Sequence, residues 1–343
     1  MTLSPRSTMA RPRSTPKRKS PTRMAARARS RRRWKSATPG RCRSRPRRWR
    51  RNERRALDRQ SAVCPRNGGK LMKDMEEGYI TEDGRKIGGV VMEMKNITLR
   101  FGGVVAIKDI SFDIREGEIR AIIGPNGAGK SSMLNVISGF YVPQEGEVWF
   151  RSEKRPPMKP FEVACQGIAR TFQNIALFEG MTVLDNVMTG RLTHMTSGLF
   201  SQALWKGRAE AEEVENREKA EKIIDFLEIQ SIRKTPVARL PYGLKKRVEL
   251  ARALVAEPKL LLLDEPMAGM NVEEKEDMSR FILDVNDEFG TTIALIEHDM
   301  GVVMDLSDRV VVMDYGKKIG DGTPDEVRSN QDVIDAYLGV SHD

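Results

Sequence analysis

One glycine-rich segment constrains the fold of this chain more than any other. Residues 124–131 read Gly-Pro-Asn-Gly-Ala-Gly-Lys-Ser, which matches the pattern G-x-x-x-x-G-K-[ST] at every fixed position. The apolar run 118–123 before it predicts a strand, and a helix is predicted to open at Lys130. In that context backbone N–H groups and the helix N-terminus can surround phosphate oxygens. The segment therefore predicts a phosphate-binding loop in an α/β fold, rather than a turn that only joins a strand to a helix.

Strands and helices are predicted to alternate along the rest of the chain. Short apolar runs predict strands, and longer stretches with an apolar stripe predict helices. Such alternation favours a parallel α/β sheet. The sequence Thr-Pro-Asp-Glu at 323–326 is a capping box with proline at the first helical position, so another helix is expected there. The predicted strands are 90–99, 110–114, 118–123, 146–151, 259–264 and 292–297, and the predicted helices are 204–227, 244–256 and 273–289.

A pair of carboxylates follows one of these strands. Four leucines, 260–263, precede Asp264 and Glu265. A buried strand delivers such side chains to the C-terminal edge of the sheet, where ligands bind in open α/β folds. Alone, this pattern is usually structural; together with the phosphate loop it predicts that Asp264 and the Ser131 hydroxyl hold Mg²⁺. Lys130 would then reach the β- and γ-phosphates, and Glu265 would act as general base on the attacking water.

Three further candidates are weak when taken singly. His298 follows the predicted strand 292–297, where an ATPase requires a contact to the γ-phosphate. A glutamine such as Gln173 is ordinarily a solvated surface residue, and a phenylalanine such as Phe101 is ordinarily a core residue. An aromatic ring just before the Gly102-Gly103 turn can also stack on an adenine ring.

The net charge of +11 divides into two unlike parts. Residues 1–71 hold 25 Lys and Arg against Glu53 and Asp58, whereas the remainder holds 34 basic and 46 acidic side chains. The first part is also poor in apolar residues, so it is predicted to be disordered. A nucleic-acid tail, a transit peptide and an untranslated leader are all open readings.

The untranslated leader is the favoured reading. Gly68-Gly69-Lys70-Leu71 back-translates to a purine-rich ribosome-binding sequence, which places a bacterial start near Met72. The expected organisation is then an Arg-rich leader at 1–71, a short linker at 72–89 and one domain at 90–343.

Cysteine usage and hydropathy favour a reduced, cytosolic protein. Cys42, Cys64 and Cys165 lack metal-ligand spacing, and only Cys165 lies in the predicted domain. The sequence contains no run of eighteen apolar residues and no apolar secretory signal at its start.

Taken in order and spacing, these motifs resemble those of an ABC ATPase from about Val91 to Gly339. The resemblance implies a P-loop NTPase ABC cassette with a RecA-like mixed or parallel sheet core, an N-terminal antiparallel β subdomain and an α-helical subdomain at about 174–257. It implies ATP hydrolysis with ATP and Mg²⁺, Glu265, His298 and Gln173 as catalytic residues, and Ser131, Gln173 and Asp264 at the metal. The implied ATP-binding residues are Phe101, Gly124, Pro125, Asn126, Gly127, Ala128, Gly129, Lys130, Ser131 and Ser132.

Two positions depart from the usual ABC pattern. The signature that meets the ATP of a second subunit normally reads Ser-Gly-Gly-Gln, and the aligned residues here are Pro241, Tyr242, Gly243 and Leu244, after Leu240. Proline supplies neither a hydroxyl nor a backbone N–H. Asn271 stands where the D-loop usually has Asp. The departures predict a slower ATPase rather than loss of ATP binding.

Within the superfamily the chain most resembles the ATP-binding proteins of branched-chain amino-acid importers. The likeness rests on segments 240–243, 296–300, 322–324 and 332–339, with Gly198-Leu199-Phe200 in the helical insertion. It implies separate permease chains, an identical or paralogous ATPase partner, an indirect solute-binding protein and no nucleic acid, at the cytoplasmic face of a bacterial inner membrane. The expected permease contact uses Leu177, Phe178, Met181 and Val183, although Val183 and Leu184 could equally be core.

Several other functions stay open from the sequence. ATPases of lipopolysaccharide export and of urea or amide import have similar C-terminal segments. A soluble ABC ATPase without a transporter and a subunit that does not hydrolyse ATP are further alternatives.

Overall fold

The computed structural model describes residues 78–81, 84–194 and 208–338. The predicted leader at 1–71, the predicted start at Met72 and the Gly198-Leu199-Phe200 segment therefore lie outside the described residues.

A six-stranded sheet forms the centre of the molecule, in the order β10-β9-β3-β8-β7-β6. The strands β3, β6, β7, β8 and β9 run parallel, and β10 is antiparallel to β9. Every residue of β3, β7 and β8 is buried, and these strands are accordingly apolar on both faces rather than alternating, except at Arg120, Asp264 and Thr292. The strands are β3 (Ile119–Ile123), β6 (Ile168–Arg170), β7 (Leu260–Asp264), β8 (Thr292–Ile296), β9 (Arg309–Asp314) and β10 (Lys317–Gly322).

A second, antiparallel sheet has the order β2-β1-β4-β5. Its buried residues, such as Met94 and Ile110, share one hydrophobic core with Leu134 of the helix after the phosphate loop and with Ile122 of β3. The predicted strand 110–114 begins earlier because Phe101 pairs with Val104 across a tight hairpin. The strands are β1 (Val90–Phe101), β2 (Val104–Arg115), β4 (Glu145–Phe150) and β5 (Glu153–Arg155).

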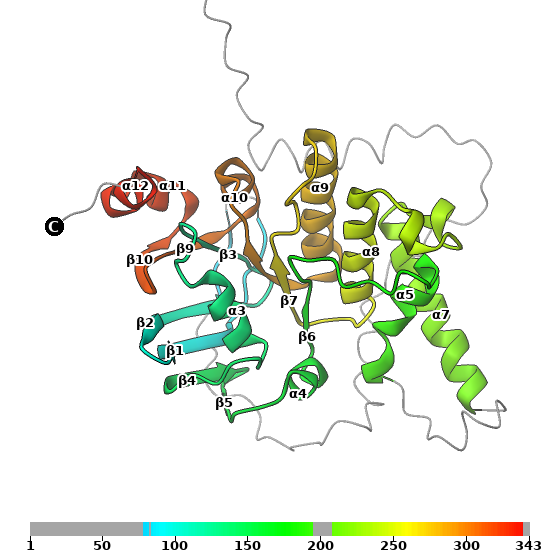
Figure 1. The fold of residues 1–343 in the computed structure, drawn as a ribbon, viewed down its shortest axis with the longest axis horizontal. Coiled ribbons are helices and arrows are strands. Elements are labelled where there is room, and N and C mark those ends of the chain that lie inside the picture. The colour runs from blue at the N-terminus through cyan, green and yellow to red at the C-terminus, as the bar shows by residue number, and fades with distance from the viewer. Residues whose placement is uncertain (1–77, 82–83, 195–207, 339–343) are drawn as a thin grey trace, which may run out of the picture.

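The helices fall into two groups around the central sheet. Figure 1 shows α5, α7 and α8 gathered on the side away from the antiparallel sheet, with α9 between them and the central strands. The described part of segment 174–257 consists of these three helices, short 3₁₀ turns and connecting loops. The helices are α3 (Lys130–Ile137), α4 (Pro160–Cys165), α5 (Val183–Thr189), α7 (Arg208–Phe226), α8 (Tyr242–Leu254), α9 (Val272–Phe289), α10 (Met300–Leu306), α11 (Pro324–Ser329) and α12 (Gln331–Leu338).

These elements confirm the predicted α/β cassette fold, and two further details differ from the prediction. Helix α8 begins at Tyr242, two residues before its predicted start, because Pro241 takes the N-cap position. The predicted linker 72–89 is, in its described part, a packed segment. Ile87 is fully buried, the Arg85 guanidinium donates to Asn286 Oδ1 over 2.6 Å, and it pairs with Asp308.

Candidate nucleotide site

The loop between β3 and α3 has a shape that only glycine allows at two points. A Cβ atom on Gly124 would lie 2.0 Å from the Met313 carbonyl oxygen, and one on Gly129 would lie 2.5 Å from the Ala106 carbonyl oxygen. Both residues, and Gly127, have positive φ angles. The outer side of the loop therefore packs against β9 and β2, whereas a Cβ on Gly127 would meet only open space.

Lys130 lies at the first position of α3 and is 6% exposed. Its Nζ donates hydrogen bonds to the carbonyl oxygens of Gly124 and Pro125, over 2.7 and 2.9 Å. Burial lowers the pKa of this ammonium group, and the carboxylates of Glu265 and Asp264 oppose that shift. The lysine is therefore folded over the loop within the field of both predicted carboxylates.

Ser131 and Ser132 follow Lys130 in the first turn of α3, where backbone N–H groups have no intrahelical acceptor. Ser131 is exposed and Ser132 is half-buried. Asn126 and Gly127 are exposed, whereas Ala128 is buried. The exposed N–H and hydroxyl groups suit an anion.

Asp264 ends β7 with one carboxylate oxygen occupied and one left over. Its Oδ2 accepts a hydrogen bond from Arg170 Nη2 over 2.8 Å, while its buried Oδ1 has no hydrogen-bond partner among the described residues. Arg170 is itself held by Asn135 Oδ1 and Ser138 Oγ, over 2.6 and 2.9 Å. The remaining carboxylate oxygen of Asp264 and the exposed hydroxyl of Ser131 are hard oxygen ligands of the kind that Mg²⁺ prefers. The donor set therefore fits this ion.

The structure brings Glu265, Gln173 and His298 together. Glu265 Oε1 lies 2.6 Å from His298 Nε2, and Glu265 Oε2 accepts a hydrogen bond from Gln173 Nε2 over 2.9 Å. The sheet order explains the meeting, because β8 lies between β3 and β7 and delivers His298 beside the end of β7. Glu265 has a φ of 48°, an uncommon conformation for a residue other than glycine. Its backbone N–H is fixed by the Ile296 carbonyl at 3.0 Å.

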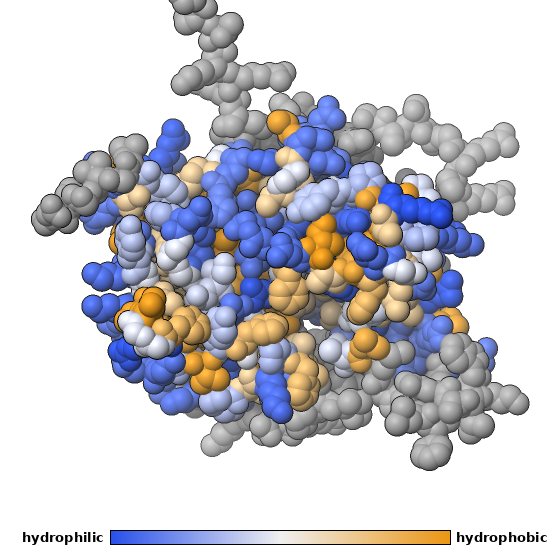
Figure 2. Space-filling view, in the orientation of Figure 1, coloured by the Kyte–Doolittle hydropathy of each residue, from blue (hydrophilic) through white to orange (hydrophobic). Residues whose placement is uncertain are grey.

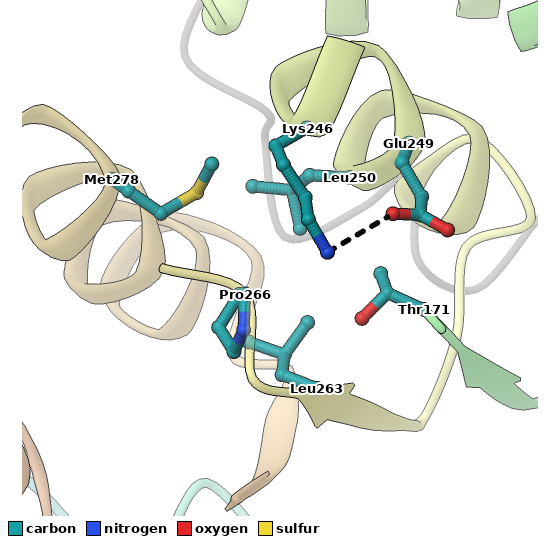
Figure 3. Close-up of a pocket in the computed structure, with 7 residues that line it drawn as sticks. All are labelled: Thr171, Lys246, Glu249, Leu250, Leu263, Pro266 and Met278. Atoms are coloured by element: carbon teal, nitrogen blue, oxygen red, sulfur yellow. Dashed lines mark ion pairs between the residues drawn. The ribbon is translucent and has the colours of Figure 1, made fainter. Parts of the chain in front are cut away.

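Helix α8 holds the segment that carries Gln173 by its backbone. Lys246 Nζ donates to the carbonyl oxygens of Phe172 and Gln173, over 3.2 and 2.8 Å, and the Phe172 N–H donates to Glu249 Oε1 over 3.3 Å. Lys246 and Glu249 are both buried and lie 3.7 Å apart. In Figure 3 they point from α8 toward Thr171. Helix α8, which begins at the signature residues, therefore fixes the backbone of the loop that carries the predicted catalytic residue Gln173.

The signature residues and Asn271 form a second group, joined through Glu274. A Cβ on Gly243 would lie 2.2 Å from Glu274 Oε1. Asn271 caps α9, since its side chain accepts from the Glu274 N–H over 2.9 Å. Leu240 is buried, Pro241 is exposed, and Tyr242 is 45% exposed.

Phe101 ends β1 with 45% of its surface exposed. Its ring meets that of Tyr141 edge to face, with centroids 5.0 Å apart. The predicted adenine contact thus remains a prediction with a half-open ring.

The predicted permease surface is only partly at the surface. Phe178 and Met181 are 54% and 42% exposed, but Val183 is fully buried and Leu177 packs against the core. Val183 and Leu177 are therefore removed from that surface, because both pack in the hydrophobic core that α5, α8 and α9 share. Figure 2 shows apolar side chains scattered over the face in view, among polar ones.

Sequence reasoning missed Arg170, Lys246, Glu249 and Glu297. Glu297, 4% exposed, accepts from the backbone N–H groups of Met267 and His298. None of these four residues belongs to a sequence motif from which its interaction partner can be predicted. Only a charged residue inside an otherwise apolar stretch could have signalled a buried role.

Comparisons with known proteins agree with this geometry. The family model described as ABC transporter matches residues 107–268, and the model described as branched-chain amino acid ATP-binding cassette transporter matches residues 317–343. The chain is 37% identical over 249 residues to the high-affinity branched-chain amino acid transport ATP-binding protein LivG of Salmonella typhimurium, covering 73% of this chain and 98% of LivG. It is 36% identical over 253 residues to BraF of Pseudomonas aeruginosa, with the same coverage of 73% and 98%.

Solved structures give the same answer. A crystal structure of an ATP-binding cassette of an ABC transporter in its ADP conformation is 32% identical with a TM-score of 0.64, covering 73% of this chain and 99% of that one. A dimeric bacterial ABC transporter cassette is 26% identical with a TM-score of 0.59, covering 68% and 98%. The chain belongs to the family of ABC transporter ATP-binding proteins that includes LivG and BraF, and it is a transporter ATPase that hydrolyses ATP.

Proposed function

We propose that this chain is the ATP-hydrolysing subunit of an importer for branched-chain amino acids. The names of LivG and BraF, and the match at 317–343, support the substrate class. The observation that carries the catalytic part is the Glu265 carboxylate, held between Gln173 and His298 beside Asp264 and the phosphate loop.

The loop residues bind the triphosphate in this proposal. Backbone N–H groups of residues 126–131 and the Lys130 ammonium group meet phosphate oxygens, and the ring of Phe101 stacks on adenine. Ser131, Asp264 and Gln173 would hold Mg²⁺, which neutralises phosphate charge when it is bound. Arg170 keeps one oxygen of Asp264 occupied and so aims the other.

Glu265 removes a proton from the attacking water. The water oxygen forms a bond to the γ-phosphorus, the bond from that phosphorus to the bridging oxygen of ADP breaks, and the proton passes through Glu265 to the released phosphate. Gln173 orients the carboxylate and the water. His298 contacts the γ-phosphate, and its Nε2 is also hydrogen-bonded to Glu265 Oε1.

The names of the relatives, which are transport ATP-binding proteins, support the proposed partners. Among the described residues no helix is both long and apolar enough to cross a membrane. Separate permease chains would dock near Phe178 and Met181, at the cytoplasmic face of the membrane, and a solute-binding protein would act indirectly. A second ATPase, identical or paralogous, would present its segment 240–243 to the bound ATP, with Asn271 at the interface. Dimeric cassettes at 26% identity support the pairing.

Reconstitution with the permeases and binding protein encoded beside this gene tests the proposal. Vesicles that contain the assembly and internal ATP should accumulate radiolabelled leucine, and vesicles with the Glu265→Gln chain should not. Equal uptake of urea, or ATP-driven uptake by the Glu265→Gln assembly at the normal rate, would contradict the substrate class or the catalytic assignment respectively.

A further inference from the structure

Glu297 is a buried carboxylate that directly follows the central strand β8. It is 4% exposed, and β8 lies between the strand that feeds the phosphate loop and the strand that carries Asp264. Burial raises the pKa of Glu297, and the nearby charge of Glu265 raises it further. A carboxylate placed there costs free energy unless both of its oxygens find donors. Its contacts should therefore explain its presence.

Both oxygens accept backbone hydrogen bonds from segments of the active site. Glu297 Oε1 accepts from the Met267 N–H over 2.8 Å, and Oε2 accepts from the His298 N–H over 3.2 Å. Met267 lies two residues after Glu265, and the His298 ring lies 2.6 Å from the Glu265 carboxylate. One side chain thus fixes the backbone on both sides of the Glu265–His298 contact.

The backbone at Glu265 depends on such support. Its φ of 48° is costly for a glutamate, on the order of 1 kcal/mol or more, and persists only where neighbouring contacts over-determine it. The Glu265 N–H is tied to Ile296, and the Met267 N–H two residues later is tied to Glu297. These two links hold the turn against consecutive residues at the end of β8.

We infer that Glu297 is a positioning residue for ATP hydrolysis. It bridges the loop after Glu265 to the His298 backbone and so keeps the general base and the histidine at their contact distance. The inference rests on the catalytic role proposed for Glu265. Glu297 itself meets neither the nucleotide nor the water.

Two substitutions grade the effect. Glu297→Gln keeps the shape and one acceptor oxygen, so kcat should fall about tenfold, and Glu297→Leu removes both acceptors, so kcat should fall about a hundredfold. The KM for ATP and the affinity for a fluorescent ATP analogue should stay within about twofold, because the phosphate loop is untouched. A kcat that is higher in Glu297→Gln than in Glu297→Leu would show that the role of this side chain depends on its acceptor oxygens.

Lys275→Met is the matched control. It breaks the ion pair between Lys275 of α9 and Asp299, the residue after His298, which spans 3.0 Å and is half-exposed. Such a pair contributes little, so at least half of kcat should remain.

Amide hydrogen exchange reports on the bridge directly. In Glu297→Leu the Met267 and His298 amides should lose protection, while the amides of β3 keep it. A Leu variant with at least half the wild-type kcat would overturn the inference. So would loss of kcat together with ATP affinity and β3 protection, which would show a purely structural role. If Glu265→Gln left turnover intact, the catalytic role proposed for Glu265 would be wrong. If Glu265→Gln lost turnover but Glu297→Leu kept it, only the inference about Glu297 would be wrong.

Discussion

The two edges of the central sheet use charged residues in opposite ways. At the C-terminal edge, Asp264 has a buried oxygen without a hydrogen-bond partner in the part of the chain that the structure describes, and Lys130 folds back over the glycine-rich loop. These groups are oriented but not saturated, so they can bind a ligand.

At the N-terminal edge the charged side chains form ion pairs with one another, although Glu118 Oε1 and two nitrogens of Arg120, Nε and Nη1, have no hydrogen-bond partner among the described residues. Arg309 at the start of β9 lies 2.8 Å from Asp113 of β2 and 3.5 Å from Glu118, and fully buried Arg120 of β3 pairs with Asp321 of β10. The hydrogen bonds that Arg309 donates to Asp113, together with the charges of the nearby carboxylates, outweigh burial and raise the pKa of Arg309. This network ties the antiparallel sheet to the central one.

The contrast separates chemistry from stability along the same strands. Substitutions at the C-terminal edge should remove activity from a folded protein, and substitutions at the N-terminal edge should weaken the fold but leave the chemistry of the remaining folded molecules intact.

The largest expected effect lies at the C-terminal edge. Glu265→Gln should lower kcat by about a thousandfold, because the water loses its base, while ATP affinity and melting temperature stay near wild type. A coupled-enzyme ATPase assay and analytical ultracentrifugation with ATP measure this, with ATP-induced dimerisation expected in the variant. Glu288→Gln, an exposed change on α9, is the control. A much lower melting temperature for Glu265→Gln would contradict the claim that substitutions at the C-terminal edge reduce activity without reducing stability.

The N-terminal edge should give the largest change in stability. Arg120→Met leaves Asp321 and Glu118 with less compensating charge in a buried site, so the unfolding free energy should fall by about 3–5 kcal/mol. Urea unfolding measures this, and kcat per folded molecule should stay within about twofold. The exposed pair Arg100–Glu145 provides a control, since Arg100→Met should cost less than about 1 kcal/mol. Loss of turnover without loss of stability in Arg120→Met would contradict the division.

Lys246→Met tests a contact between the helical side and the C-terminal edge. Without the ammonium group the Phe172 and Gln173 carbonyls lose their donor, so Gln173 is held less firmly against Glu265 and kcat should fall about tenfold. Steady-state kinetics should show an unchanged KM for ATP. Lys245→Met is the neighbouring control, because Lys245 only approaches exposed Glu179, at 3.8 Å. Equal kcat values in the two variants would contradict the proposal that Lys246 of α8 holds Gln173 in position.

The smallest expected effect is a change in the pH dependence of stability. Burial raises the pKa of Glu118 from 4.5 to about 7, against the opposing pull of Arg120 and Arg309. An acid with a raised folded pKa loses stability as pH climbs from its unfolded pKa to its folded one, here between about 4.5 and 7. Glu118→Gln should flatten that decline and be more stable than wild type at pH 8 by about 1–3 kcal/mol. Thermal melts from pH 5 to 8 measure this; a less stable variant at pH 8 would mean that its ion pairs outweigh its burial.

The sequence predicted the C-terminal edge far better than the N-terminal edge. The phosphate loop is contiguous, and the leucine run before Asp264 marks a buried strand, so local pattern sufficed. The partners Arg309 and Asp113 are 196 residues apart, and Arg120 and Asp321 are 201 apart. No local pattern links them, and β9 and β10, which bring them together, were not predicted either. Glu297 and Lys246 were missed for a similar reason, since Met267, which Glu297 holds, and Phe172 and Gln173, which Lys246 holds, are bound through backbone groups far away in the sequence.

The affinity of Lys130→Ala for ATP tests the central claim most directly. The claim is that the loop at the end of β3, with its lysine, binds the triphosphate beside Asp264 and Glu265. Titration with a fluorescent ATP analogue should show affinity at least about a hundredfold weaker than wild type, with turnover lost and the folded state retained. Unchanged affinity and turnover in the Lys130→Ala protein would contradict the account.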